Sequence, residues 1–227
     1  MKRSTINEHL RAGDEFIRSF GYVMPPFAYF KPDELKAKIA ERPAMRDARL
    51  GWDLTDYGEG KFDEMGLFLF TVRNGSLADL RAGQGMCYAE KIMISRHDQL
   101  SPMHRHIVKA EDIINRGGAK LAIKMYESDA EGQIDRARDV TVQVDGRVHT
   151  QAPGEVLLLA PGESVTLMPG NWHAFWGEGG DVLIGEVSTV NDDLTDNVFE
   201  QPISRFSTVE EDEAPEWLLV SDYDTWL

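Results

Sequence analysis

The stretch of the sequence most suggestive of chemistry is PMHRHIVKAED, residues 102–112, in which His104 and His106 alternate. On a β-strand, alternate side chains point to the same face, and their Cβ atoms lie about 6–7 Å apart, which a metal ion can bridge. Glu111 follows at an odd offset, so on an unbroken strand it would point to the opposite face. The stretch therefore predicts a metal site only if the chain turns within residues 107–110.

His173, in LMPGNWHAFWG, is the fourth candidate ligand. It follows a Pro-Gly turn signal and stands among aromatic residues that would exclude water. Taken singly, such a histidine is more often structural, and an alternating pair is a weak motif. Together, three imidazoles and one carboxylate would leave open positions on an octahedral ion. This donor set suits Mn²⁺, with Co²⁺, Fe²⁺ or Ni²⁺ as alternatives.

A metal ion with adjacent open positions can chelate the carbonyl and neighbouring hydroxyl oxygens of an open-chain sugar and stabilise an enediolate. Aldose–ketose isomerisation would then need a base that moves a proton between C1 and C2. In DVLIGEVSTV, Glu186 alternates with Ile184. If that face points inward, burial would raise the pKa of Glu186 towards useful base strength; in the opposite register Glu186 is solvated.

Two further positions could contact a substrate. Lys91 alternates with small and apolar residues, so its ammonium could point inward and stabilise negative charge, or lie at the surface like most lysines. The loop STVNDDLTDNVF carries Asp192, Asp193 and Asp196, and one of these carboxylates could bind sugar hydroxyls. For each aspartate taken singly, a solvated acidic loop is the alternative.

The composition narrows the class of protein. The chain has 227 residues, 42% of them hydrophobic and 28% charged, as in soluble globular proteins. No apolar run approaches the roughly 20 residues of a membrane helix, and the N-terminus lacks the apolar core of a signal peptide. Cys87 is the only cysteine, which excludes an intramolecular disulfide and favours the cytoplasm. The net charge of −15 argues against nucleic-acid binding, whereas a neutral substrate meets no penalty.

Hydrophobic periodicity predicts the elements that position these residues. Residues 4–21 and 31–42 predict amphipathic helices, and residues 43–64 are expected to be mostly loop. From residue 65 onward, short strand-like runs alternate with turn signals such as Asn74-Gly75 and Asp145-Gly146, which indicates a sandwich or barrel. We expect a helical extension over residues 1–63 that packs on the barrel, a barrel over 64–200, and a tail over 201–227 that packs on the body or on a partner subunit.

The two histidine motifs resemble those of the cupin superfamily. The first cupin motif has a histidine pair, a glutamate and a glycine, matched here by His104, His106, Glu111 and Gly118. The second has proline, glycine and histidine, matched by PGNWH, which ends at His173. Asp98 and Gly177 stand where the pattern has glycine and asparagine. The resemblance implies a mainly β, jelly-roll-like cupin barrel over about residues 64–190, with the histidines and the glutamate as metal ligands.

Over nearly all of its length the sequence is similar to the cupin-type D-lyxose isomerases. The similarity lies in the helical N-terminal extension, PMHRHIVKAEDIINRGG, PGNWHAFWG and GEVSTVNDDLTDN. It implies a Mn²⁺-dependent homodimer that interconverts D-lyxose and D-xylulose and, to a lesser extent, D-mannose and D-fructose. It also implies that Lys91, Glu186 and Asp193 act as acid–base and sugar-contacting residues.

Three other functions remain open. A cupin dioxygenase or oxidase uses the same ligands but needs a redox-active ion and an apolar pocket. A phosphosugar isomerase needs a cationic phosphate site, for which Arg105, Lys109 and Arg116 lie near the motif. A sugar-binding cupin would lack turnover. The ionisable groups at positions 91 and 186 favour a polyol substrate and catalysis.

Overall fold

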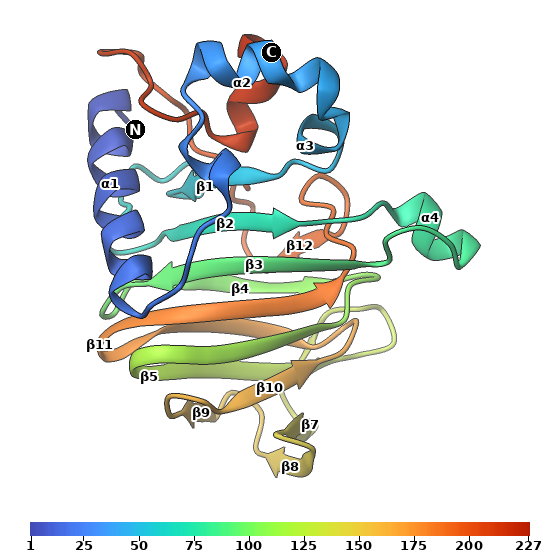
Figure 1. Cartoon of the computed structure of the whole chain (residues 1–227). Helices are drawn as coiled ribbons and strands as arrows, with labels where there is room; N and C mark the ends of the chain where they lie inside the picture. Colours follow the sequence, from blue (N-terminus) through green and yellow to red (C-terminus); the bar gives the residue numbers. More distant parts are fainter.

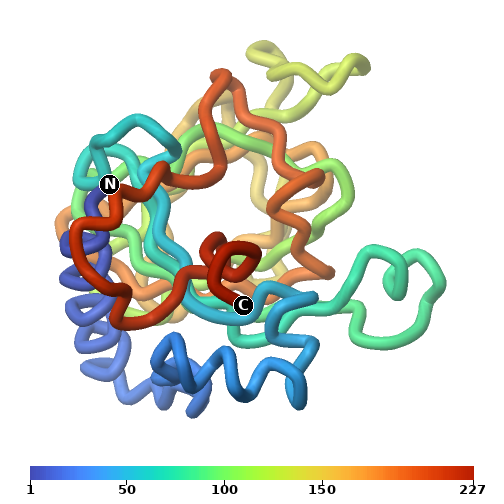
Figure 2. The backbone as a smooth tube through the Cα atoms, turned by 90° about the horizontal axis from the view of Figure 1, so that it is seen from above, coloured from blue at the N-terminus to red at the C-terminus, as the bar shows by residue number.

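A single twelve-stranded sheet, closed into a barrel, forms most of the molecule in the computed structural model, which describes residues 1–227 (Figure 1). The main path runs, in spatial order, through β1 (Gly51–Thr55), β2 (Leu67–Arg73), β3 (Tyr88–Ser95), β11 (Trp172–Thr189), β5 (Glu111–Ser128), β10 (Ser164–Leu167), β7 (Val140–Val144) and β8 (Arg147–Gln151). Four strands pair beside it: β4 (Ser101–His106), β6 (Ile134–Asp135), β9 (Val156–Leu159) and β12 (Asn197–Phe199). All these pairings are antiparallel, and Figure 2 shows the strands as a ring. The predicted mainly β barrel is confirmed.

The two longest strands, β5 and β11, bend together and so serve two sides of the barrel. Each has 18 residues, and their pairing shifts register between Glu178 and Val182. Such a bulge bends both strands and increases their twist. At the bend of β5, Gly118 has a φ of 95°, and a side chain there would collide with the carbonyl of Asp181. The glycine of the first motif is therefore needed for backbone geometry.

Alternation along the strands sorts side chains between two cores. On β2, Leu67 and Leu69 belong to the cluster inside the barrel, whereas Phe68 and Phe70 belong to a second cluster on the outer face. The inner cluster also holds Met93 of β3 and Ile184 of β11. Because the side-chain period of a strand is two, residues 91 and 186 must point inward with them.

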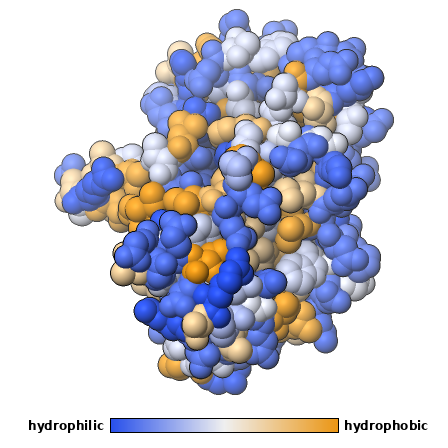
Figure 3. All heavy atoms as spheres, turned by 180° about the vertical axis from the view of Figure 1, so that it is seen from behind, coloured by the Kyte–Doolittle hydropathy of each residue, from blue (hydrophilic) through white to orange (hydrophobic).

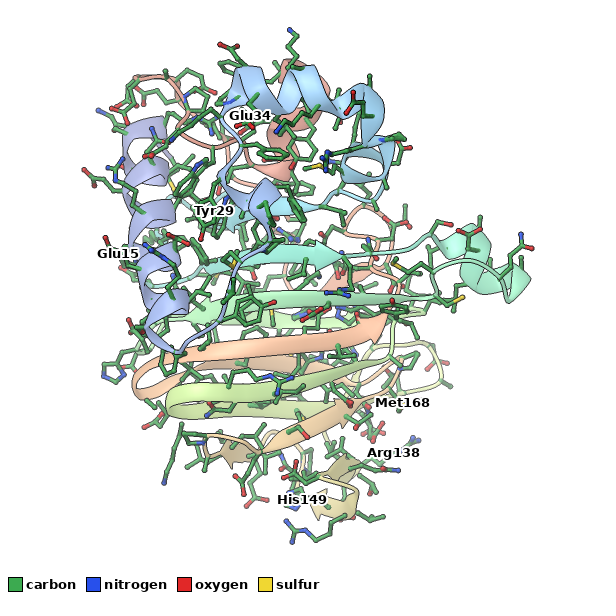
Figure 4. All side chains as sticks on the ribbon, viewed as in Figure 1. Glu15, Tyr29, Glu34, Arg138, His149 and Met168 are labelled. Atoms are coloured by element: carbon green, nitrogen blue, oxygen red, sulfur yellow. The ribbon has the colours of Figure 1, made fainter.

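The outer core is covered by the helix α1 (Arg3–Ser19), which lies against one flank of the sheet (Figure 1). Its buried residues Ile6, Leu10 and Ile17 pack on the outer face of β1, β2 and β3. Tyr29, in η1 (Pro26–Tyr29), donates a hydrogen bond to Asp14 of α1 at 2.8 Å (Figure 4). The remaining N-terminal elements are α2 (Pro32–Lys38), η2 (Ile39–Glu41) and α3 (Pro43–Asp47). Figure 2 shows α1 and α2 outside the ring of strands.

The C-terminal tail packs back on the body, as expected. It ends in η3 (Val220–Asp222) and α5 (Tyr223–Trp226). Arg3 of α1 is fully buried and forms ion pairs with Glu211 at 2.6 Å and Asp222 at 2.9 Å. These contacts join the two ends of the chain, while Trp217 and Leu219 complete the outer core.

Two local predictions need correction. The segment expected to be mostly loop contains α3 and β1, and β1 is the edge strand of the same sheet as the barrel. Asn74-Gly75 does not close a hairpin: the chain leaves the sheet, forms α4 (Leu77–Ala82), which projects from the body, and returns as β3 (Figure 1). The side chain of Ser76 caps the start of α4 by accepting a hydrogen bond from the N–H of Asp79. A helix therefore begins where the turn signal predicted a hairpin. The division at residues 63 and 200 stays a prediction.

Hydrophilic residues cover much of the rear surface, with apolar residues in scattered patches, some of them beside the projecting arm (Figure 3). Met86 and Tyr88, where the arm rejoins the sheet, are both exposed. Among the helices of the structure, we find none with the length and apolar character required to cross a lipid bilayer.

Candidate metal centre and pocket

Three histidines meet inside the barrel. His104 and His106 stand at the end of β4, and His173 stands near the start of β11, directly opposite His104 in the strand pairing. A ligand atom of each lies within 4.8 Å of the others. The strand expected for the alternating pair is therefore present, and the fold brings His173 to the same face.

The turn required within residues 107–110 is also present. β4 ends at His106 and β5 begins at Glu111, so the intervening residues reverse the chain. Glu111 Oε1 then lies 3.2 Å from His106 Nε2 and 3.1 Å from His173 Nε2. The structure thus brings together all four predicted ligands.

Asp196 holds this turn through its backbone. Its carboxylate accepts hydrogen bonds from the N–H groups of Ile107 at 3.0 Å, Val108 at 2.7 Å and Lys109 at 2.9 Å. Asp196 is buried, at 2% exposure, and directly precedes β12, which pairs with β4. Its oxygens face the turn, and Asp196 does not line the pocket described below.

The histidine rings are oriented for metal binding. Nδ1 of His104 lies 2.8 Å from the carbonyl oxygen of Pro102, and Nδ1 of His173 lies 3.1 Å from that of Asn171. A carbonyl only accepts, so each Nδ1 carries the hydrogen and each Nε2 keeps a free lone pair. His106 Nε2, His173 Nε2 and Glu111 Oε1 are buried without a hydrogen-bond partner. Buried polar atoms normally have partners, so these unpaired donors of electron pairs fit a metal ion.

Electrostatics in the cluster favour the metal-binding protonation states. Burial, reinforced by the neighbouring His173, holds the pKa of His104 well below its usual value, and burial with Lys109 lowers the pKa of His106. Burial would by itself raise the pKa of Glu111, but Lys109 and His106 outweigh it and hold that pKa well below its usual value. Neutral imidazoles and an ionised carboxylate are the forms that bind metals.

A pocket opens beside the cluster. Apolar side chains of the inner core form part of its wall, and its charged lining residues are Lys91, Lys109, Glu111, Glu186, Asp193 and Arg205. A hollow in which convergent polar groups meet an apolar wall is typical of a small-molecule site.

Glu186 and Lys91 both point into this pocket. They stand directly opposite each other in the pairing of β11 with β3, and their exposed fractions are 3% and 4%. The inward register of Glu186 is therefore confirmed, but its expected pKa is wrong. Burial raises that pKa, yet the ammonium groups of Lys109 at 3.1 Å and Lys91 at 3.5 Å lower it below the usual value.

Asp193 also reaches the pocket, whereas Asp192 does not line it. Asp192 caps its own loop through Leu194 and Thr195. Asp193 lies 3.3 Å from Arg205 Nε, and although burial would raise its pKa, Arg205 and Lys91 lower it strongly.

Two pocket residues were missed as site residues. The sequence suggests Lys109 only as a phosphate-binding cation. Lys109 stands two residues before Glu111, however, and on an extended chain the two side chains would share a face, which could have indicated a place in the site. Arg205 pairs with Asp53 of β1 at 2.9 Å, and its Nη1 is buried without a partner. Arg205 lies in the segment expected to be a tail, and no local pattern marks it.

Backbone geometry explains the departures from the cupin pattern. Asp98, which replaces a glycine, has a φ of 56°, in the left-handed region that aspartate tolerates better than most residues. At Gly177, which replaces an asparagine, a side chain would collide with the carbonyls of Gly180 and Arg96. Neither position contacts the metal cluster.

The other histidines lie outside the site. His149 is on β8, at the end of the molecule opposite the N-terminal helices, and its Nε2 lies 3.1 Å from Gln151 (Figure 4). His9 of α1 is bound by Arg96 at 2.9 Å, on the outer face of the sheet. The metal cluster is therefore built only from the histidines of the two motifs.

Comparison with known proteins shows the family of the chain. A family model described as D-lyxose isomerase matches residues 1–223. A D-lyxose/D-mannose isomerase of Serratia proteamaculans is 48% identical over 228 residues, covering 98% of each chain, and one of Escherichia coli O157:H7 is 44% identical over 226 residues with the same coverage.

Solved structures show the same fold at low sequence identity. An L-ribose isomerase of Acinetobacter sp. DL28, in complex with L-ribose, matches with a TM-score of 0.62 and 12% identity over 92% of this chain and 98% of that one. An L-ribose isomerase of Cellulomonas parahominis, with L-psicose, matches with a TM-score of 0.59 and 14% identity over the same shares. The match to the family model over almost the whole chain, together with these relatives, shows that the protein belongs to the D-lyxose isomerase family.

Proposed function

We propose that the protein is a Mn²⁺-dependent aldose–ketose isomerase that interconverts D-lyxose and D-xylulose, and also D-mannose and D-fructose. The observation that carries the proposal is one pocket in which the histidine–glutamate cluster adjoins a buried, ionised Glu186. The names of the relatives, D-lyxose/D-mannose isomerase, support this choice of sugars.

The residues fit a resident metal ion. His104, His106, Glu111 and His173 would hold it, because their unpaired atoms converge and their protonation states suit a divalent cation. Nitrogen and oxygen donors without thiolates favour Mn²⁺, with Co²⁺, Fe²⁺ or Ni²⁺ able to substitute. When bound, such an ion supplies polarisation of a sugar carbonyl and stabilisation of negative charge on its oxygens.

Glu186 would act as the base. Its carboxylate is ionised, so it can accept the proton from C2 of the open-chain aldose and return it to C1, while the hydroxyl proton passes from O2 to O1. Lys91 donates to Asn191 Oδ1 at 2.6 Å and lies near Glu186, where its positive charge would stabilise the negative charge that develops on the substrate oxygens. Both groups are fixed on neighbouring strands, which limits reorganisation during the reaction.

Asp193 and Arg205 would bind the hydroxyl groups of the sugar. Arg205 is held by Asp53 and Asp193, which leaves its buried Nη1 without an acceptor. A buried donor without a partner costs about 1–3 kcal/mol, which a substrate hydroxyl oxygen would recover. Asp193 can in turn accept hydrogen bonds from hydroxyl groups, which suits a neutral polyol.

The cations of the site argue against a phosphorylated substrate. Lys109 contacts two carboxylates, and Arg205 contacts two others. Arg105 donates to the carbonyl of Gly132 and lies over the ring of Trp172, away from the pocket lining. With its cations neutralised in this way, the pocket offers no cationic phosphate cradle.

The proposal also includes a homodimer located in the cytoplasm. Support for the dimer is the resemblance to the isomerase family. Support for the cytoplasm is the single cysteine, Cys87, which is free and therefore makes no demand for an oxidising compartment. Sedimentation of the purified protein measures the oligomeric state directly.

The test of the function is incubation of the Mn²⁺-loaded protein with D-lyxose, D-mannose, D-xylose and their phosphates. We expect ketose from D-lyxose and D-mannose and no oxygen uptake. Removal of metal by a chelator should abolish turnover and Mn²⁺ should restore it; unchanged activity without metal would refute the mechanism. Oxygen consumption would identify an oxidase. Preferential turnover of the sugar phosphates would identify a phosphosugar isomerase, and sugar binding without ketose formation would identify a binding protein.

A further inference from the structure

We propose that Lys109 is a positioning residue that restricts Glu111 to one metal-binding oxygen and so keeps a coordination position free for the sugar. The inference rests on the proposed metal site and adds a role that neither the cupin pattern nor the family resemblance assigned to this lysine.

The two carboxylate oxygens of Glu111 have different surroundings. Oε2 lies 2.6 Å from Lys109 Nζ. Oε1 is buried, has no hydrogen-bond partner, and faces the Nε2 atoms of His106 and His173 at 3.2 and 3.1 Å. The ammonium therefore occupies one oxygen and leaves the other for the metal ion.

Lys109 is held at both ends and is almost completely buried. Its backbone N–H donates to Asp196 at 2.9 Å, and its Nζ also donates to Glu186 at 3.1 Å. The residue is 3% exposed. An ammonium buried this deeply needs its carboxylate partners, so the contact with Glu111 is not a casual surface pair.

The division of oxygens matters for the number of open positions. A carboxylate can bind a metal ion through one oxygen or through both. With three imidazoles and one oxygen, an octahedral ion keeps about two positions open, which the carbonyl and hydroxyl oxygens of a sugar can fill. If Glu111 bound through both oxygens, about one position would remain, and chelation of the sugar would be lost.

Replacement of Lys109 by methionine separates this role from simple support of the site. The variant removes the partner of Oε2 and also a positive charge next to the cation site. Both changes favour the metal ion, so we expect Mn²⁺ to bind at least as tightly as in the wild type. The number of waters on the ion should fall by about one, and KM for D-lyxose should rise about tenfold or more.

Lys91→Met is the matched control. Lys91 is equally buried, and its ion-pair and hydrogen-bond partners are Glu186 and Asn191 rather than Glu111. Both variants remove a positive charge beside Glu186, and only Lys109→Met frees a ligand oxygen. Lys109→Arg keeps a cation and donors at Oε2, so it should retain the water number of the wild type and serves as the rescue variant.

The measurement is the number of coordinated waters, from broadening of the Mn²⁺ electron paramagnetic resonance lines in ¹⁷O-enriched water, with the Mn²⁺ Kd from calorimetry. We expect a loss of about one water in Lys109→Met and no change in Lys91→Met or Lys109→Arg. An unchanged water number in Lys109→Met would overturn the proposal. So would Mn²⁺ binding weakened tenfold or more, because Lys109 would then support the site itself.

Misfolding of Lys109→Met does not remove the test. Lys109→Gln, which keeps only a neutral donor near Oε2, is then measured in its place. A loss of about one water relative to the wild type would show that the charge is needed, and an unchanged water number would overturn the proposal. If neither neutral variant folds with metal, Lys109 is a structural residue and the proposal fails. The proposed function can fail separately. A wild-type protein that binds Mn²⁺ with about two waters but forms no ketose would refute the isomerase activity and leave this inference intact.

Discussion

Replacing Glu186 by glutamine tests the assignment of the base with almost no change in side-chain shape. Glu186 Oε1 lies 3.1 Å from Lys109 Nζ and 3.5 Å from Lys91 Nζ. At an effective dielectric constant of about 20, unit charges at such distances interact by about 5 kcal/mol, which keeps the carboxylate ionised despite its burial. Glutamine carries no charge and cannot take up a proton, so transfer between C1 and C2 would lose its base.

Glu186→Gln should lose activity while it stays folded, so the loss of activity would report on the base and not on unfolding. A positioned general base contributes about 10²–10⁴-fold, or about 3–5 kcal/mol in activation free energy. Both lysines keep another acceptor, Lys109 at Glu111 Oε2 and Lys91 at Asn191 Oδ1. The free energy of unfolding should therefore fall by about 3 kcal/mol, the low end for breaking a buried ion pair, which a typical domain survives.

The assay combines kcat for ketose formation, Mn²⁺ content, and exchange of the C2 proton with D₂O. Glu90→Gln is the matched control, because Glu90 stands next to Lys91 on β3 but points outward, where it pairs with Arg73 at 2.8 Å. We expect slow turnover and slow exchange in Glu186→Gln at full metal content, and near-normal values in Glu90→Gln. Turnover of Glu186→Gln within about threefold of the wild type would refute the assignment of the base.

Three further predictions concern the polar groups around the pocket. Arg205→Met should raise KM for D-lyxose at least tenfold, because the sugar loses a hydrogen-bond donor. The same change leaves buried carboxylates unpaired, so the free energy of unfolding should fall by about 3–5 kcal/mol. An unchanged KM in steady-state kinetics would contradict a substrate role. Asp196→Asn removes an acceptor from the turn that carries Lys109, so the free energy of unfolding should fall by about 1–3 kcal/mol and Mn²⁺ should bind more weakly. Asp192→Asn is the control. An equal melting temperature and an equal Mn²⁺ Kd in the two variants would count against the role of the turn. The folded state lowers the pKa of Asp193, so its stabilisation is full above about pH 4 and is lost as the pH falls through the folded pKa. The stability difference between wild type and Asp193→Asn should therefore shrink on acidification below about pH 4 in urea titrations, and a constant difference would refute the linkage.

Three of the four candidate ligands could be predicted from local geometry, whereas His173 could be predicted from its place in the second motif. Alternation places His104 and His106 on one face whatever the rest of the fold does, and the offset to Glu111 admits only a turn. Alternation alone could not decide which way Glu186 points, because both faces of β11 meet apolar cores. That choice depends on α1 covering one face, with the pocket left to the other.

The electrostatics of the site could not be predicted, because they arise from contacts between distant segments. The pKa of Glu186 falls instead of rising because Lys109, which precedes β5, reaches across to β11. Arg205 and Asp53 are 152 positions apart in the chain. Asp196 has its structural role only because β12 pairs with β4 and so brings its carboxylate to the turn.

The charged side chains of the pocket balance one another, although the chain as a whole carries a net charge of −15. The charged lining residues of the pocket comprise three cations and three anions: Lys91, Lys109, Arg205, Glu111, Glu186 and Asp193. These side-chain charges balance, so a bound divalent ion would make the pocket positive by about two charges. A neutral sugar would meet this excess through the dipoles of its carbonyl and hydroxyl groups, and more strongly once its carbonyl oxygen becomes negative during proton transfer. The excess charge therefore stabilises the transition state more than the bound sugar.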